Sequence, residues 1–182
     1  MPLPGDFFVT RTPGVWAGII RWATSSTVNH AGVYVGAVVG YKRPQVIEAR
    51  PGGAGYRDAS AYADAVWSSG ALSALDTPTV VQRRDIVTAA RQALGTPYGV
   101  LDIVAIALAQ HRTGALVKAA VALQHQPWWV RRIMSMRTLI CSQLVDECYT
   151  AAGLHLFPDG RLPGLVSPGD LYGLLAANEV MS

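Results

Sequence analysis

The sequence predicts an α+β domain in which the strands come first along the chain and the helices second. Up to residue 68, short runs rich in β-branched and aromatic residues alternate with clusters of turn residues, which is typical of antiparallel strands. From Thr79 onward, apolar residues recur every three or four positions, which is typical of helices that bury one face. Strands followed by helices are the order expected of an α+β fold.

Length and composition indicate a single domain over residues 1–182. A chain of this length can bury a core without disulfides or metal ions, and the sequence contains no internal repeat and no linker. Hydrophobic residues make up 51% of the chain and charged residues only 15%, which is apolar for a soluble protein. No uninterrupted apolar run reaches the roughly 18 residues that a membrane-spanning helix needs.

The first residues, MPLPGD, have neither the basic region nor the apolar region of a signal peptide. We therefore expect a protein that is cytoplasmic or that is released by a route without a signal peptide, as in a bacterium or a phage. The positive charge does not predict a nucleic-acid partner, because the net charge is only +3 and its thirteen arginines and two lysines are scattered. The sequence leaves the oligomeric state open.

The expected elements of the first half are mostly strands. Two β-branched runs are separated by the turn 40–44, which predicts an antiparallel pair. The glycine-rich stretch 51–55 predicts a loop, and it lacks the pattern of a phosphate-binding turn. The expected strands are 7–10, 30–39, 45–50 and 65–68, and the expected helices are 15–23 and a short one at 58–64.

Helices account for most of the second half. Thr79 is a suitable N-cap for a helix over 80–94, and a last helix is expected from Ser167 to about Ala177. Between them, an apolar insertion at about 99–136 contains two helical patterns, 100–109 and 115–123, followed by Trp128-Trp129 and Arg131-Arg132. This insertion predicts either extra core helices, or an apolar pocket or membrane-facing surface.

Residues 138–153 predict one helix, with Thr138 as its N-cap and Asp146 and Glu147 facing outward. Cys141 then lies in the first turn, where unpaired N–H groups and the helix dipole favour a thiolate over a thiol. Cys148 is seven residues further on, about 10 Å along the helix axis, so a disulfide between the two would require a break in the helix. We expect Cys148 to be a small buried apolar residue.

A reactive thiolate needs an imidazole beside it and a third polar group to orient that imidazole. His30 begins an apolar strand after a polar loop, where a helix N-terminus could meet it, whereas His111, His125 and His155 lie in polar turns or after a helix end. Glu48 lies on the partner strand, flanked by apolar residues. A carboxylate in that position needs a partner, and His30 is available. Each residue alone has a structural interpretation, but together they make a coherent triad.

Three blocks of the sequence resemble NlpC-type cysteine peptidases of the papain-like superfamily. The segment 30–36 (HAGVYVG) resembles their histidine strand, 46–49 (VIEA) resembles the next strand with the third polar residue, and 139–145 (LICSQLV) is similar to their nucleophile helix. The order His, Glu, Cys resembles the circularly permuted branch, which includes lecithin retinol acyltransferase-like proteins. Gly5-Asp6 and the segment 95–98 (GTPY) also match features of that family.

This resemblance implies a papain-like fold in permuted order, with a small antiparallel sheet packed against helices. It also implies a cysteine hydrolase that cleaves an amide bond in a cell-wall peptide, an isopeptide or an acyl amide through a thioester acyl-enzyme. Cys141 would be the nucleophile, His30 the general base and then acid, and Glu48 the residue that orients the imidazole. The backbone N–H of Cys141 would contribute to an oxyanion hole, and Tyr98 and Ser142 are weaker candidates for contacts with substrate or oxyanion.

Two alternatives remain open. A lipid acyl hydrolase or acyltransferase could use the same triad, with the apolar insertion as an acyl pocket or a peripheral membrane contact. A papain-like module could also bind such ligands without turnover. No cofactor or metal is expected, because the histidines lack HxxxH or HxH spacing and the two cysteines lack zinc-motif spacing.

Overall fold

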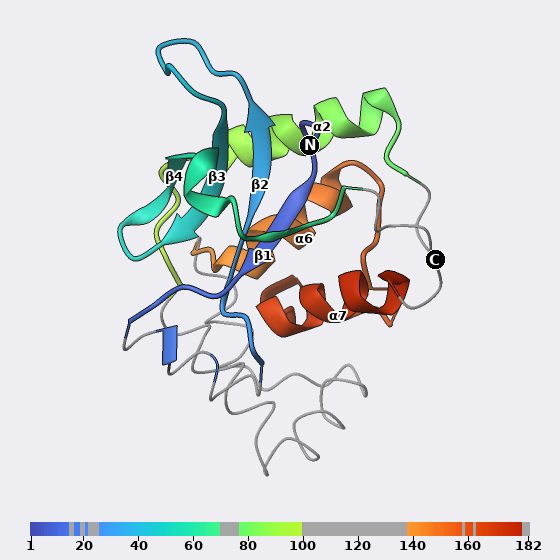
Figure 1. Cartoon of the computed structure of the whole chain (residues 1–182). Helices are drawn as coiled ribbons and strands as arrows, with labels where there is room; N and C mark the ends of the chain where they lie inside the picture. Colours follow the sequence, from blue (N-terminus) through green and yellow to red (C-terminus); the bar gives the residue numbers. More distant parts are fainter. Residues whose placement is uncertain are drawn as a thin grey trace.

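The computed structural model describes residues 1–14, 17, 18, 21, 26–69, 77–99, 138–157, 159–161 and 163–179 (Figure 1). The apolar insertion expected at about 99–136 lies outside these residues, apart from Gly99. The insertion includes Trp128, Trp129, Arg131 and Arg132, so these four residues are also outside the described part. Most of the helix expected at 15–23 lies outside it as well.

The described residues form an α+β structure, which confirms the predicted fold class. Five strands make one antiparallel sheet in the order β4-β3-β2-β1-β5, and all of them precede helix α2 in the chain. The strands are β1 (Phe7–Thr10), β2 (His30–Gly36), β3 (Gln45–Arg50), β4 (Gly53–Asp58) and β5 (Val66–Trp67); the helices are η1 (Ala59–Tyr62), α2 (Val80–Gln92), α6 (Cys141–Ala151), η2 (Pro163–Leu165) and α7 (Pro168–Glu179).

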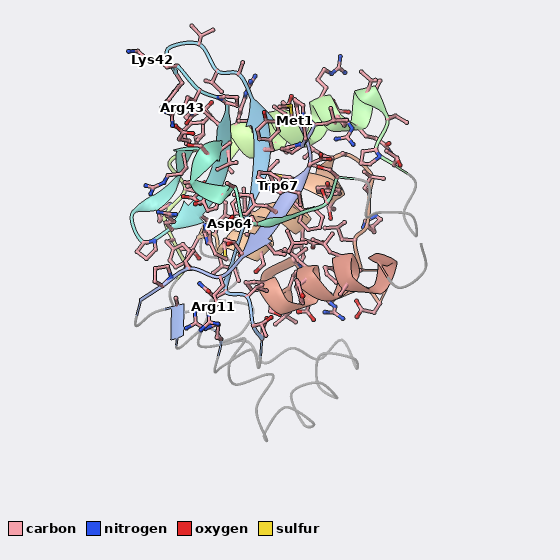
Figure 2. All side chains as sticks on the ribbon, in the orientation of Figure 1. Met1, Arg11, Lys42, Arg43, Asp64 and Trp67 are labelled. Atoms are coloured by element: carbon pink, nitrogen blue, oxygen red, sulfur yellow. The ribbon has the colours of Figure 1, made fainter. Side chains whose placement is uncertain are left out.

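The main core lies between one face of the sheet and the helices α2, α6 and α7 (Figure 1). Alternation along the strands sends one set of apolar side chains into this core and the opposite set to the other face. On that other face Phe8, Val46 and Tyr62 form a second, smaller cluster, against which Trp67 (labelled in Figure 2) is packed. The core-facing side chains of the sheet are Phe7, Val9, Ala31, Val33, Val35, Ile47 and Ala49.

Strand β4 corrects the prediction of a loop at 51–55. Gly53–Asp58 pairs with the whole of β3, from Arg50 opposite Gly53 to Gln45 opposite Asp58. The strand was not predicted because its glycines give no alternation of apolar and polar side chains. Its backbone can still pair with β3, because pairing does not require side chains. Gly53 is required for close packing: its φ is +106°, and a Cβ there would lie 2.9 Å from the carbonyl oxygen of Thr96.

Helix α6 begins later than predicted. Its first residue is Cys141, and the N-cap is Ile140, which is extended and provides no side-chain hydrogen bond, so Thr138 is not the cap. The reason is tertiary: Leu139 forms a parallel bridge with Tyr98, in which Leu139 N–H donates to Pro97 and Gly99 N–H donates to Leu139. This pairing keeps the chain extended up to Ile140.

Asp146 of α6 was predicted to face outward and is instead buried, with only 5% of its surface exposed. Helix α6 packs against α2, β2, β3, η2 and α7, so more than one of its faces is covered. Burial, followed by the charge of Glu147, raises the pKa of the Asp146 carboxyl.

The starts of α2 and α7 agree with the sequence, whereas β2 ends at Gly36, before the expected residue 39, and α2 ends at Gln92, before the expected residue 94. Thr79 caps α2 in a capping box with Gln82, and the side chains of Ser167 and Asp170 bond across the first turn of α7. Within the described part of the chain, no helix has the length and apolar character needed to cross a membrane.

Candidate active site

His30 lies at the start of β2, paired with Thr10 of β1. Its side chain points to the sheet face that carries the smaller cluster, with its ring 6.1 Å from that of Phe8 and 6.2 Å from that of Tyr62. Only 6% of the residue is exposed. The next residue on this face is Gly32, where a Cβ would lie 2.8 Å from the Phe8 ring, so the glycine lets Phe8 pack closely beside the histidine.

Glu48 lies on the neighbouring strand β3 and faces the same side. Its Oε2 is 2.6 Å from His30 Nε2, and both side chains are buried. The sequence could not decide which face Glu48 occupies, and the register settles it: Val33 pairs with Ile47, so Glu48 follows on the face opposite the main core. The structure therefore brings together two residues that are 18 positions apart.

Cys141 is the first residue of α6 and is 3% exposed. Its thiol donates a weak hydrogen bond to the carbonyl oxygen of Asn29, with a sulfur–oxygen distance of 3.9 Å, and its sulfur lies near enough to the His30 ring to raise the pKa of that imidazole. Because Glu48 occupies Nε2 of that ring, Nδ1 is the nitrogen left for Cys141. The three predicted site residues thus form a chain of contacts in the order Cys141, His30, Glu48.

The electrostatics of the pair favour a charged imidazole. Burial alone would lower the pKa of His30, but hydrogen bonds to Cys141 and Glu48, together with their charges, raise it from 6.5 to about 9. Burial alone would raise the pKa of Glu48, but its hydrogen bond to His30 and the charges and donors around it lower the pKa below the ordinary value. The arrangement therefore stabilises an imidazolium next to the sulfur.

Asn29 fixes the backbone that precedes His30. Its Oδ1 accepts hydrogen bonds from the Thr12 N–H at 2.9 Å and from Arg21 at 3.1 Å, and its amide nitrogen donates to the Thr12 hydroxyl at 2.6 Å. The carbonyl that faces Cys141 is thereby held in place. Asn29 was not among the residues predicted from the sequence, although an amide side chain directly before the histidine strand could have suggested this role.

Two further residues at the site were also missed. Arg50 Nε forms an ion pair with Glu48 Oε1, and the Tyr62 hydroxyl donates to Glu48 Oε2. Arg50 also donates to the Tyr62 oxygen at 2.6 Å. Alternation in β3 could have revealed Arg50, which is two residues after Glu48 and so on the same face. Tyr62 comes from η1, and only the tertiary structure brings it to the site.

The two weaker candidates, Tyr98 and Ser142, lie near the start of α6. The backbone of Tyr98 bridges to Leu139, two residues before Cys141, and its half-buried side chain packs on the main core. Ser142 is fully buried, and its hydroxyl donates to the Val166 carbonyl at 2.6 Å. A contact between this hydroxyl and a substrate would require that bond to break.

Cys148 is buried as predicted and differs from Cys141 in its surroundings. Burial, followed by the charge of Glu147, raises the pKa of the Cys148 thiol to about 12, so this thiol stays protonated at neutral pH. In the part of the chain that the structure describes, no three His, Cys, Asp or Glu side chains come together as they would to hold a metal ion.

No protein-family model matches the chain, and no curated protein matches it either.

Proposed function

We propose that the chain is a cysteine hydrolase of the papain-like superfamily, in circularly permuted order, that cleaves an amide bond through a thioester acyl-enzyme. The observation that carries this proposal is the buried His30 imidazole, which contacts the Cys141 thiol at the start of a helix and the Glu48 carboxylate at 2.6 Å. A nucleophile, a base beside it and a group that orients the base are the parts that covalent acyl transfer needs.

In the proposed reaction, His30 holds the proton of Cys141, and the sulfur attacks the substrate carbonyl carbon. The first backbone N–H groups of α6 have no partner within the helix and are suited to bind the resulting oxyanion. The tetrahedral intermediate collapses when the imidazolium transfers its proton to the leaving amine, and a thioester remains on Cys141. His30 then takes a proton from water, the hydroxide attacks the thioester, and the acid is released as the thiol re-forms.

Glu48 has an orienting role in this proposal. Its hydrogen bond to Nε2 keeps Nδ1 directed at the sulfur, and its charge stabilises the imidazolium that forms in each half-reaction. The substrate class is an amide of a peptide, an isopeptide or an acyl group, and cell-wall peptides are the first group to test.

The experiment that tests the proposal is labelling with a thiol-directed acyl electrophile, followed by intact-mass analysis and peptide mapping. We expect one adduct, on Cys141, that requires His30 and leaves Cys148 unmodified. Incubation with cell-wall peptides, isopeptides and acyl amides should then trap a hydroxylamine-sensitive acyl-enzyme with one class. Equal labelling of both cysteines, unaffected by His30→Gln, would show a binding module in place of an enzyme. Release of fatty acid from lipids alone would show a lipid acyl hydrolase.

A further inference from the structure

Glu48 has more hydrogen-bond donors than an orienting carboxylate needs. His30 and Tyr62 both donate to Oε2, and Arg50 pairs with Oε1, so both oxygens are engaged. The donors come from three different elements: β2 supplies the histidine, β3 the arginine and η1 the tyrosine. In the described part of the chain, these are the titratable or charged groups that contact this carboxylate.

Arg50 and Tyr62 are themselves held in place. The Tyr62 ring stacks on Phe8 with centroids 4.2 Å apart, and its hydroxyl accepts a hydrogen bond from Arg50 at 2.6 Å while donating to Glu48. Burial and the adjacent carboxylate raise the pKa of the Tyr62 phenol, so it keeps the proton that it donates. Arg50, Tyr62 and Glu48 therefore form a closed triangle of hydrogen bonds and an ion pair.

The triangle restricts the orientation of the Glu48 carboxylate. A carboxylate held by the imidazole alone could rotate about its terminal bond, because this torsion is broad. Arg50 on one oxygen and Tyr62 on the other leave one orientation in which Oε2 also meets His30. The side chain of Arg50 remains 37% exposed, so the guanidinium lies at the boundary between the buried site and solvent.

We propose that Arg50 and Tyr62 are positioning residues of the active site, which fix the Glu48 carboxylate so that it orients the His30 imidazole toward Cys141. The proposal rests on the proposed function for its catalytic meaning, although the positioning itself can be measured without turnover. In a purely structural role, the triangle would attach η1 to the sheet without affecting how Glu48 orients His30.

The variants Tyr62→Phe and Arg50→Gln test this role. Tyr62→Phe removes one hydroxyl and keeps the ring that stacks on Phe8, so the fold is expected to survive. The matched controls are Tyr41→Phe and Arg57→Gln, since Tyr41 is half exposed on the β2–β3 hairpin and Arg57 is exposed on β4. Arg50→Lys serves as the conservative variant, because it keeps the charge without the forked geometry.

The first readout is the rate of Cys141 alkylation by iodoacetamide from pH 4 to 10, followed by peptide mapping. Each variant removes a donor that favours ionised Glu48, so Glu48 should take up its proton at higher pH. The acidic limb of the Cys141 alkylation profile should then also move to higher pH. We expect a roughly three- to tenfold lower rate at pH 5 for each variant, as for loss of the net contribution of one typical hydrogen bond. Both controls should follow the wild-type profile, and Arg50→Lys should lie between Arg50→Gln and the wild type.

The second readout is the ring 1H–15N signal of His30, which reports its hydrogen bond to Glu48 whether or not the protein turns over a substrate. It should shift or broaden in Tyr62→Phe and Arg50→Gln and stay in place in the two controls. Profiles and ring signals that coincide with the wild type, even with a lower melting temperature, would overturn the proposal. Failure of the proposed function looks different: His30→Gln would then leave the wild-type reactivity of Cys141 unchanged.

Discussion

The imidazole of His30 donates across two neighbouring strands to the carboxylate of Glu48, with 2.6 Å between Nε2 and Oε2. Both residues are buried on the sheet face opposite the main core, whereas Cys141 comes from a helix that packs on the other face. The sulfur and the imidazole meet because His30 is the first residue of its strand, at the end of the sheet reached by the start of α6.

The two cysteines are expected to differ in reactivity at pH 7. Cys141 contacts an imidazole that stays protonated to about pH 9, whereas the pKa of Cys148 is raised to about 12 by burial. We expect iodoacetamide to modify Cys141 first, and the Cys141→Ala variant to lose the fast adduct completely. Cys148→Ala should react like the wild type. Modification of both thiols at the same rate in the native protein would contradict this expectation. The reference is urea-unfolded protein, in which the two thiols are equally accessible.

His30→Gln should slow the alkylation of Cys141 at pH 7 by roughly tenfold or more, because the positive charge that stabilises a thiolate is lost. Glutamine can still donate to Glu48, so the buried carboxylate keeps a partner. The measurement is the second-order rate constant, compared with that of a His155→Gln control, since His155 is exposed and lies after the end of α6. A rate constant equal to that of the control would show that His30 does not control the reactivity of Cys141.

Glu48→Gln should lower the pKa of His30 from its value of about 9. The carboxylate raises this pKa through both a hydrogen bond and its charge, and the substituted amide retains at most the hydrogen bond. NMR titration of the His30 ring protons measures the change directly, with the ring signals of His155 as an internal reference. An unchanged His30 titration in Glu48→Gln would show that the carboxylate does not control the charge of the imidazole.

The positions of the three main site residues could be predicted because each depends on local pattern. His30 follows from the start of an apolar strand, Glu48 from a charge within such a strand, and Cys141 from the start of a helix. Their catalytic roles stay predictions. Tyr62 could not be found in this way, because its place depends on how η1 packs against Phe8, which no local periodicity encodes.

Errors in the predicted fold have similar causes. The cap of α6 was misplaced because the pairing of Leu139 with Tyr98 decides where the helix begins, and that pairing joins segments about 40 residues apart. Strand β4 was missed because its first residues are small and give no alternation, whereas its pairing with β3 is continuous. Local pattern identifies an element, but tertiary contacts fix its ends.

Gly53 provides a test of strand β4. Gly53→Ala should lower the free energy of unfolding by roughly 1–3 kcal/mol, because the residue has a positive φ and its Cβ would approach the Thr96 carbonyl oxygen at 2.9 Å. The control is Gly55→Ala on the same strand, where a Cβ would meet no atom within 4 Å. Urea unfolding measures both variants, and equal stability of the two would contradict the close packing of β4 against residues 95–96.

The raised pKa of His30 predicts how stability depends on pH. The imidazole titrates near 6.5 in the unfolded chain and at about 9 in the folded protein, so the folded state holds the proton more tightly. Its contribution to stability is therefore complete below pH 6.5 and is lost as the pH rises from 6.5 to 9, with an upper limit on the order of 3 kcal/mol.

Urea unfolding at intervals across this range should show a decline in the free energy of unfolding of the wild type that is absent in His30→Gln. In Cys141→Ala the decline should be smaller, because one of the two partners that raise this pKa is gone. A wild-type decline that persists unchanged in His30→Gln would assign the titration to another group and would remove the electrostatic basis for the imidazolium beside Cys141.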